Sequence, residues 1–206
     1  MTITILDYGV GNLKSVQKAF EYLGESTLIT NDPEDINNAT KLVFPGQGAC
    51  GQAMVYLKAR HLIEPVTQFI RCGRPFLGIC LGFQLLFDSS EEDGGQDTLG
   101  LISGQVKRFS EPNLKVPQMG WNILNIKKGF GNQGPCFSRC RSGDYVYFVH
   151  SFYATDVDSK VVTSTATYGE TTFVASVCQD NMWGMQFHPE KSGDVGLRIL
   201  ADFVTL

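Results

Sequence analysis

The first half of the chain alternates short apolar runs with stretches that carry apolar residues at helical spacing. Runs rich in β-branched and aromatic residues predict strands at 3–7, 26–30, 41–46 and 75–79. Between these runs the spacing predicts helices at about 13–23, 49–60 and 63–71, with Gly24 ending the first and Pro33 opening a short helical turn. This alternation predicts a mostly parallel sheet with helices on both faces.

After about Ser103 the pattern changes to short β-like segments separated by turn residues. The segments predict antiparallel hairpins and lie at 104–109, 116–126, 144–154, 160–169, 172–179 and 182–188. A last helix is expected at about 195–205, where apolar residues share one face. We therefore expect a single α/β domain over residues 1–206, with an antiparallel β portion added in its second half.

Composition and charge narrow the function classes. The 206 residues are 43% hydrophobic and 18% charged, with a formal net charge of −4. These values are typical of a globular protein and favour neither nucleic acid nor a membrane surface as a partner. No apolar run approaches the roughly 20 residues that cross a bilayer. The N-terminal residues lack the features of a signal peptide, so a cytoplasmic location is expected.

The six cysteines and three histidines predict neither a disulfide framework nor a metal centre. Cys136 and Cys140 have no second pair at zinc-ligand spacing, and the histidines lie far apart in the sequence. The stretch DYGVGN at 7–12 begins like a dinucleotide fingerprint, but Lys14 stands where the third glycine would be. We expect no metal and no cofactor.

The stretch GICLG at 78–82 places Cys80 between two glycines, where a predicted strand meets an apolar, helix-like run over 81–87. This is the form of a nucleophile elbow, in which small residues allow a sharp strand-to-helix turn. The helix N-terminus would favour the thiolate, and the N–H of Leu81 would point at an adjacent oxyanion. The pentapeptide alone fits a buried cysteine beside packing glycines equally well.

A catalytic cysteine needs a base and a group that orients the base. His188 follows a predicted strand, and Glu190 could hold its imidazole so that the other nitrogen faces Cys80. The alternatives are a surface histidine at a strand end and a carboxylate that caps the last helix. The loop FPGQG at 44–48 ends another predicted strand, so its glycine amides would lie at the same sheet edge and could bind an oxyanion.

Together these motifs resemble the class I (triad) glutamine amidotransferases, a family with a flavodoxin-like α/β fold. The resemblance to the class is carried by PGQG, GICLGFQLLF and HPEKS. A narrower resemblance, to the glutaminase subunits of imidazole glycerol phosphate synthases in histidine biosynthesis, is carried by LDYGVGNLKSV, VPQMGWN, YFVHSFY and the length. The matches run from residue 5 to the last helix.

The resemblance implies a reaction. Cys80 would attack the side-chain amide of L-glutamine, and His188, oriented by Glu190, would pass the proton to the departing ammonia. Water would then hydrolyse the γ-glutamyl thioester to glutamate. The oxyanion donors would be the amides of Leu81 and Gly48.

The resemblance also implies substrate contacts. Gln84 matches the position that contacts bound glutamine, and the amino-acid end would be held by the segment His150, Ser151 and Phe152, largely through backbone groups. For His150 an ordinary strand position, in the core or beside the pocket, is the alternative to a direct role.

A partner is implied as well. Ammonia would pass through a tunnel, within a heterodimer, to a (β/α)8-barrel cyclase subunit that forms imidazole glycerol phosphate and 5-aminoimidazole-4-carboxamide ribonucleotide (AICAR). Four residues match positions near that interface: Asn12, Trp121, Asn122 and Lys191. The alternatives are core packing for Trp121 and a solvated charge for Lys191.

Three residues depart from the usual pattern of the family. Gln47 stands where a small aliphatic residue is common, Phe152 where tyrosine is common, and Phe83 where methionine is common. A polar side chain at position 47 would change how the oxyanion loop takes up its position. The other two would change the shape of the pocket or its coupling to the partner.

Two other functions stay open on the sequence. A stand-alone cysteine hydrolase, such as a γ-glutamyl hydrolase, would use the same scaffold, but VPQMGWN and DYGVGN argue against it. A non-catalytic binding subunit would have no reason to keep Cys80, His188 and Glu190 together.

Overall fold

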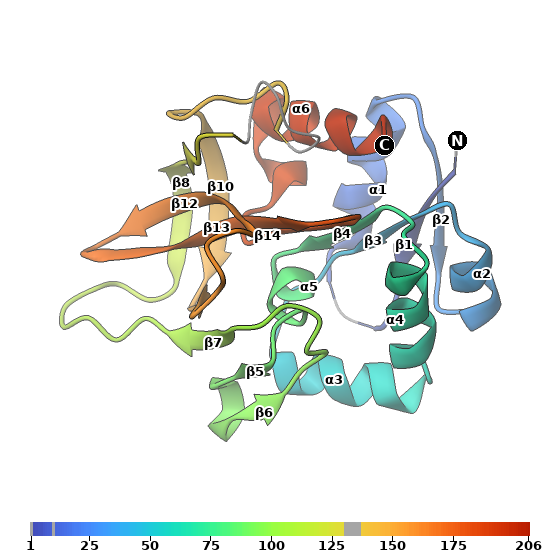
Figure 1. The fold of residues 1–206 in the computed structure, drawn as a ribbon, viewed down its shortest axis with the longest axis horizontal. Helices are drawn as coiled ribbons and strands as arrows, with labels where there is room; N and C mark the ends of the chain where they lie inside the picture. Colours follow the sequence, from blue (N-terminus) through green and yellow to red (C-terminus); the bar gives the residue numbers. More distant parts are fainter. Residues whose placement is uncertain (1, 10, 130–136) are drawn as a thin grey trace.

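The computed structural model describes residues 2–9, 11–129 and 137–206 (Figure 1). Val10 of the glycine-rich turn and Cys136 of the cysteine pair lie outside the described residues. The helices are α1 (Leu13–Tyr22), α2 (Pro33–Asn38), α3 (Cys50–Ala59), α4 (Ile63–Arg71), α5 (Leu81–Gln84), α6 (Gly193–Val204) and the 3-10 helices η1 (Glu92–Gly94) and η2 (Pro189–Lys191). The strands are β1 (Thr2–Leu6), β2 (Ser26–Thr30), β3 (Lys41–Phe44), β4 (Phe76–Ile79), β5 (Ser89–Ser90), β6 (Gln96–Asp97), β7 (Gln105–Arg108), β8 (Gln118–Ile123), β9 (Asn125–Ile126), β10 (Tyr145–His150), β11 (Phe152–Thr155), β12 (Val162–Tyr168), β13 (Thr171–Gln179) and β14 (Met182–Met185).

The main sheet has a parallel half and a mostly antiparallel half. The parallel half runs in the order β2-β1-β3-β4-β14. β13 joins β14 in the antiparallel direction, and β11, β7, β5 and β6 continue the sheet, while β12 pairs with β13 and β9. β8 and β10 form a separate antiparallel ribbon. The predicted fold class, a mostly parallel sheet flanked by helices with an antiparallel addition, is confirmed.

The alternation of side chains along the buried strands produces two cores. On β3, Val43 packs in one core with residues of α1 and α6, whereas Leu42 and Phe44 pack in the other with residues of α2, α3 and α4. Figure 1 shows α1 and α6 on one side of the sheet and α3 and α4 on the other. The sheet is therefore covered by helices on both faces. The carboxyl ends of its parallel strands are left for a binding site.

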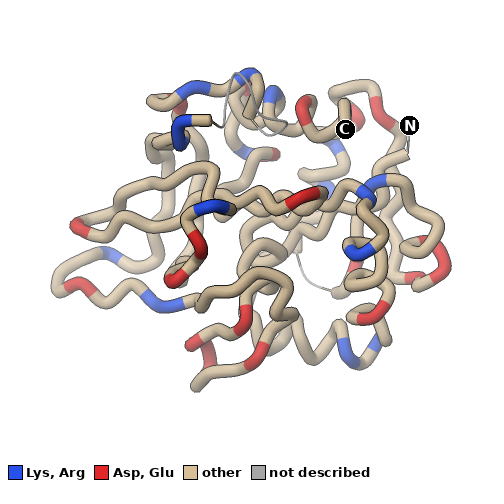
Figure 2. The backbone as a smooth tube through the Cα atoms, in the orientation of Figure 1, with Lys and Arg blue, Asp and Glu red and all other residues tan. Residues whose placement is uncertain are grey.

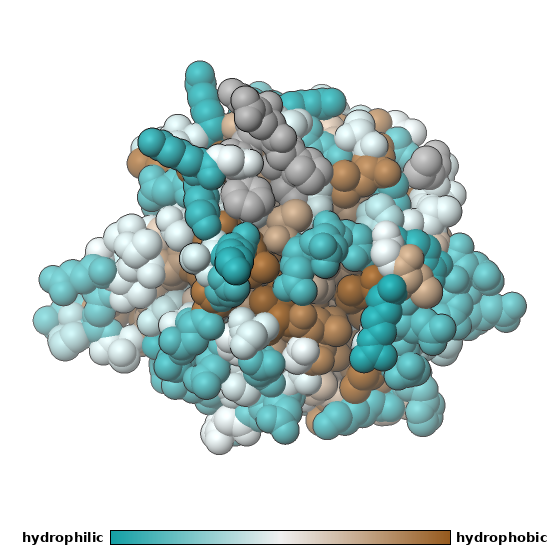
Figure 3. All heavy atoms as spheres, viewed as in Figure 1, coloured by the Kyte–Doolittle hydropathy of each residue, from teal (hydrophilic) through white to brown (hydrophobic). Residues whose placement is uncertain are grey.

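Charges of both signs are spread over the fold, and acidic residues gather around β5, η1 and β6 (Figure 2). On the face shown in Figure 3, hydrophilic residues occupy most of the rim and apolar residues show in the middle. Within the described ranges, no helix has the length and apolar character needed to cross a membrane.

Four predicted boundaries were wrong. The segment 116–126 forms two strands, since β8 pairs with β10 while β9 pairs with β12. The helix after Cys80 ends at Gln84 rather than near Phe87, because the N–H groups of Leu86 and Phe87 donate to carbonyls three residues back, at Phe83 and Gln84, and so leave the α-helical pattern. The segment 144–154 forms two strands, since β10 pairs with β8 while β11 pairs with β7 and β13. The strand that leads to His188 ends at Met185, because the N–H of His188 donates to the carbonyl of Tyr147 on the ribbon.

Candidate active site

Three neighbouring parallel strands end at one edge of the sheet. β3 leads into the loop 45–48, β4 ends directly before Cys80, and β14 is followed after two residues by His188. Ligands of open α/β sheets bind at the carboxyl ends of the strands. The topology therefore brings the three predicted motifs to one place, although they are far apart in the sequence.

Cys80 lies on a sharp turn between β4 and α5. Its backbone has φ 54° and ψ −104°, a conformation that residues with a side chain rarely adopt. A Cβ on Gly78 would lie 2.8 Å from the carbonyl oxygen of Gly82, and a Cβ on Gly82 would lie 1.8 Å from the carbonyl oxygen of Phe44. Both neighbours are backbone atoms, so both positions require glycine. The stretch GICLG has the geometry of a nucleophile elbow.

The sulfur of Cys80 lies close to two polar groups of the protein. Sγ lies 3.9 Å from the carbonyl oxygen of Val149 and 3.8 Å from Nε2 of Gln186. None of the described residues accepts a hydrogen bond from the N–H of Leu81, the next residue. This amide is therefore available to bind the oxyanion that forms when the sulfur attacks a carbonyl carbon.

His188 and Glu190 form a buried pair. Nδ1 of His188 lies 2.7 Å from Oε1 of Glu190, and each side chain is 2% exposed. The pair is held by the main chain, since the N–H of His188 donates to the carbonyl of Tyr147 and the carbonyl of His188 accepts from the hydroxyl of Ser192. Nε2 of His188 has no partner among the described residues. Glu190 thus fixes the tautomer that leaves Nε2 free.

The charge of this pair depends on Cys80. Burial lowers the pKa of His188, but the Cys80 thiolate and the Glu190 carboxylate outweigh burial and raise that pKa to about 10. The imidazole therefore carries its proton at neutral pH when the sulfur is negatively charged. An imidazolium beside the sulfur favours the thiolate, which is the nucleophilic form of cysteine.

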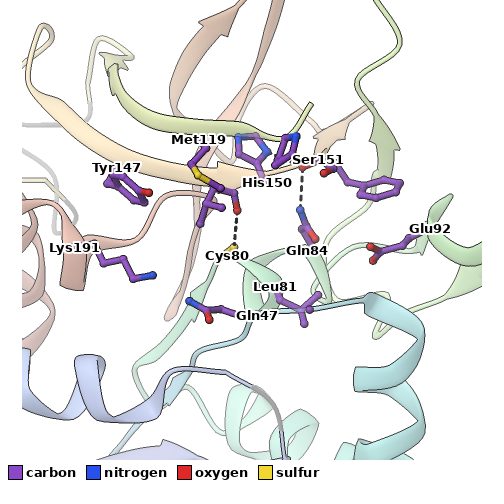
Figure 4. A pocket seen from close by; sticks show the side chains of 14 residues that line it. Gln47, Cys80, Leu81, Gln84, Glu92, Met119, Tyr147, His150, Ser151 and Lys191 are labelled. Carbon is purple, nitrogen blue, oxygen red and sulfur yellow. Dashed lines mark hydrogen bonds between the residues drawn. The ribbon is translucent and has the colours of Figure 1, made fainter. Parts of the chain in front are cut away.

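A cavity of about 480 Å³ opens over Cys80 (Figure 4). This volume is in the range of small-molecule sites. The predicted residues that line it are Gly48, Cys80, Leu81, Gln84, His150, Ser151, Phe152 and Lys191. Gln47, which departs from the family pattern, also lines it. In Figure 4, Cys80 and Gln84 lie on one side of the cavity and His150 and Ser151 on the other.

Three predicted interface residues lie outside the cavity wall. The side chain of Asn12 caps α1 by accepting from the N–H of Ser15. The side chain of Asn122 donates to the carbonyl of Thr167. Trp121 is 56% exposed, so the alternative of ordinary core packing for this residue is wrong.

Several residues at the site were missed in the sequence, among them the cavity-lining Pro117, Met119, Tyr147 and Val149. Two others bear on the chemistry. Glu92 lines the cavity, its Oε2 accepts from the N–H of Cys50 at 2.6 Å, and burial raises the pKa of its carboxyl. In the sequence it sits in an acidic, glycine-containing stretch typical of a surface loop. Gln186 is fully buried against Cys80. Its only sequence signal is its place two residues before His188 on an apolar strand.

His150 is locked in a neutral state. Its Nδ1 lies 2.7 Å from the carbonyl oxygen of Phe152, which accepts the N–H of the ring, and its Nε2 lies 3.0 Å from Oε1 of Gln118, whose amide must turn its NH₂ group toward Nε2 when the ring is neutral. Burial, helped by the charge of His188, lowers the pKa of His150 to about 4. Both ring nitrogens are engaged and the ring stays uncharged at neutral pH, so His150 is not placed to act as the base.

This state of His150 predicts a pH dependence of stability. Because the pKa is lowered in the folded protein, the unfolded chain takes up a proton first as the pH falls, and stability is lost between about pH 6.5 and pH 4. The contribution is about 3 kcal/mol at full extent. In His150→Asn, which keeps a donor for Phe152, urea unfolding should show a smaller loss of free energy between pH 7 and pH 4. The exposed His61→Asn should match the wild type, and equal pH slopes for all three proteins would contradict the assignment.

The ribbon of β8 and β10 carries an exposed apolar face beside the cavity. Met119 is 65% exposed and Tyr145 is 53% exposed, and Trp121 and Ile123 are exposed on the same face. Met119 and Tyr147 of this face also line the cavity. Monomeric proteins rarely expose apolar side chains in such a group, so this face is a candidate interaction surface at the mouth of the site.

Comparison with known proteins gives consistent results. The family model of the class I glutamine amidotransferases matches residues 4–206. Imidazole glycerol phosphate synthase subunit HisH of Syntrophotalea carbinolica is 50% identical over 98% of this chain and 98% of the relative. The same subunit is 47% identical in Geobacter sulfurreducens, over 98% of this chain and 97% of the relative. In Thermosynechococcus vestitus the subunit is 45% identical, over 99% of this chain and 96% of the relative.

The fold is also found in solved structures. A crystal structure of a glutamine amidotransferase has a TM-score of 0.75 at 17% identity, covering 99% of each chain. PurLQS from Thermotoga maritima contains a chain with a TM-score of 0.74 at 18% identity, covering 99% of this chain and 97% of that one. Within the described residues, no three His, Cys, Asp or Glu side chains form a group that could hold a metal ion.

Proposed function

Since the chain belongs to the class I glutamine amidotransferase family, we propose that it is the glutamine-hydrolysing subunit of an imidazole glycerol phosphate synthase. The observation that carries the proposal is the convergence of the Cys80 elbow with the buried pair of His188 and Glu190. A nucleophile, a base and a group that orients the base form the unit needed for acyl transfer. The relatives supply the narrower assignment, because they match almost the whole chain.

The reaction proceeds in two steps on these residues. The sulfur of Cys80 attacks the side-chain amide carbon of glutamine, and the oxyanion is bound by the amides of Leu81 and Gly48. His188 gives its proton to the leaving nitrogen, so ammonia departs and a γ-glutamyl thioester remains. Water, deprotonated by His188, attacks the thioester, and glutamate leaves as the sulfur is regenerated. The balance is glutamine and water in, glutamate and ammonia out.

Recognition of the amino-acid end is assigned to the side of the cavity near residues 150–152. Glutamine carries an α-ammonium group there, and Glu92 is the acidic side chain among the described residues that line the cavity. One oxygen of Glu92 is held by the N–H of Cys50, which leaves the other for the substrate. Ser151 and Phe152 lie near Glu92, since the three residues also line a neighbouring hollow together. We assign Glu92 to the α-ammonium, and Gln84 to the neighbouring wall.

Glu92→Gln should raise the KM for glutamine by roughly 10- to 100-fold with little change in kcat. A hydrogen bond to a charged group is worth about 1.5–3 kcal/mol, and this one is equally present in the ground state and the transition state. Steady-state glutaminase kinetics measure the effects on KM and on kcat separately. Glu91→Gln is the matched control, because Glu91 does not line this cavity. A fall in kcat at unchanged KM would contradict the assignment.

The partner is proposed to be a (β/α)8-barrel cyclase subunit that docks on the apolar face of the β8–β10 ribbon. That face borders the cavity, so a subunit seated on it would cover the mouth from which ammonia leaves. Trp121 lies on this face, and Lys191 lies at the cavity wall. Ammonia kept from water stays unprotonated and nucleophilic, which ring formation requires. The proposed setting is the cytoplasm, because the relatives are subunits of a biosynthetic synthase.

The test is glutamine turnover with and without the barrel subunit. We expect weak hydrolysis by the isolated chain, strong hydrolysis in the complex, and transfer of the glutamine amide nitrogen into imidazole glycerol phosphate. Label from amide-¹⁵N glutamine measures the transfer. Full turnover by the isolated chain, unchanged by the partner, would instead identify a stand-alone hydrolase.

A further inference from the structure

A chain of buried amides connects the cavity wall to the sulfur of Cys80. Nε2 of Gln84 lies 3.0 Å from the carbonyl oxygen of Phe152 and 3.0 Å from Oε1 of Gln186. Nε2 of Gln186 lies 3.8 Å from Sγ of Cys80. Both glutamine side chains are buried, and Gln186 is 0% exposed. The triad alone does not explain a fully buried amide that contacts the nucleophile.

The direction of every hydrogen bond in this chain is determined by its first acceptor. The carbonyl oxygen of Phe152 can only accept, so Gln84 must turn its NH₂ group toward it. The second N–H of that group faces Gln186, which must therefore present its oxygen. The NH₂ group of Gln186 is then the end that faces Cys80. Exchanging oxygen and nitrogen in either amide would oppose two donors or two acceptors.

Cys50 completes the other end of the chain. Its Sγ lies 3.8 Å from Oε1 of Gln84. Burial raises the pKa of Cys50 to about 12, so this residue stays a thiol and can donate to the amide oxygen. Gln84 thus has both amide hydrogens and its oxygen engaged within the protein. Its orientation, and with it that of Gln186, is set before any substrate binds.

We propose that Gln186 is a positioning residue that donates a hydrogen bond to the sulfur of Cys80, and that Gln84 and the carbonyl of Phe152 hold it in the donating orientation. The inference rests on the proposed function, since it concerns the same nucleophile. A donor stabilises the thiolate more than the thiol, because hydrogen bonds to charged acceptors are stronger. The carbonyl of Val149, on the contrary, can accept only from the thiol. Gln186 therefore shifts the balance toward the reactive form and fixes the position of Sγ.

The test is the pH dependence of alkylation of Cys80 by iodoacetamide, on the full chain without glutamine or partner. Peptide mass mapping separates Cys80 from the other thiols. Gln186→Met removes the donor at similar volume, and we expect the midpoint of alkylation to rise by about one pH unit. Gln186→Glu keeps an acceptor for Gln84 but places a carboxylate against the sulfur, and its midpoint should rise by about two units.

Gln105→Glu is the matched control, because it places the same charge on an exposed position of β7. Its midpoint should equal that of the wild type. Thermal unfolding confirms that each variant is folded, and either folded variant at position 186 decides the question. Unchanged midpoints would overturn the inference while leaving the proposed function intact. If Cys80 of the wild type reacted no faster than the exposed Cys72, the proposed function itself would fail.

Discussion

Cys80→Ala should lower the glutamine hydrolysis of the complex at least about 10⁴-fold. In the proposed reaction the sulfur forms the covalent intermediate, and no other described thiol lines the cavity. Ring formation supplied with ammonium salts should be retained, because the change leaves the partner and the fold intact. Alanine has nearly the volume of the cysteine, so stability should change little. Paired assays with glutamine and with ammonium chloride measure both activities.

The matched control for this experiment is Cys72→Ala. Cys72 is an exposed cysteine at the end of α4, so its removal should affect neither activity. Glutamine turnover that survived in Cys80→Ala would remove this residue from the reaction. Loss of both activities would show that the substitution disturbed the complex rather than the chemistry.

Gly82→Ala should destabilise the protein by at least about 3 kcal/mol, or prevent it from folding. The new Cβ would lie 1.8 Å from the carbonyl oxygen of Phe44, which is a backbone atom of a central strand. To make room, α5 and β3 would have to separate, and the loop 45–48 would move away from Cys80. Glutaminase activity should fall with stability. Urea unfolding and soluble yield measure the effect.

Gly51→Ala is the comparison for this prediction. Gly51 also lies in a helix, but a Cβ there would meet only the end of the Gln96 side chain, which can rotate away. Alanine favours helix by up to about 1 kcal/mol over glycine, so this variant should be as stable as the wild type or more stable. If Gly82→Ala and Gly51→Ala unfolded at the same urea concentration, the close approach at the elbow would not be a constraint.

The parallel half of the fold could be predicted because its signals are local. Short apolar runs marked β1, β3 and β4, and helical spacing marked α1, α3 and α4, all close to their observed bounds. The rule that parallel strands end at one edge then placed the loop 45–48 beside Cys80. Gly78 and Gly82 made the sharp turn at Cys80 predictable, because no larger side chain fits at either position.

The second half could be predicted as β-rich but not as a pairing scheme. A continuous apolar pattern over 144–154 hides the point at which the chain leaves the ribbon for the main sheet. The pairing partners lie far apart in the sequence, and period-2 alternation is the same for both sheets. The length of α5 was also hidden, because the change at Leu86 and Phe87 to hydrogen bonds three residues back leaves no mark in the apolar pattern.

The residues of the site also divide into those that could be predicted from the sequence and those that could not. Cys80, His188 and Glu190 stand in short sequence patterns, and the spacing within each pattern follows from the geometry that the proposed reaction needs. Glu92 and Gln186 belong to no such pattern, since their part in the site comes from what they contact after folding. An acidic residue in a polar loop and an amide in an apolar strand are each unremarkable until distant segments meet.

The most direct test of the account is covalent labelling with a glutamine-derived diazoketone, which alkylates a nucleophile positioned to attack the side chain of bound glutamine. The complex with the barrel subunit is incubated with the reagent, with and without excess glutamine, and the peptides are mapped by mass spectrometry. We expect one label per chain, on Cys80, with loss of glutaminase activity in proportion to labelling and protection by glutamine. Inactivation without a label on Cys80, or a label on another cysteine that glutamine protects, would contradict it.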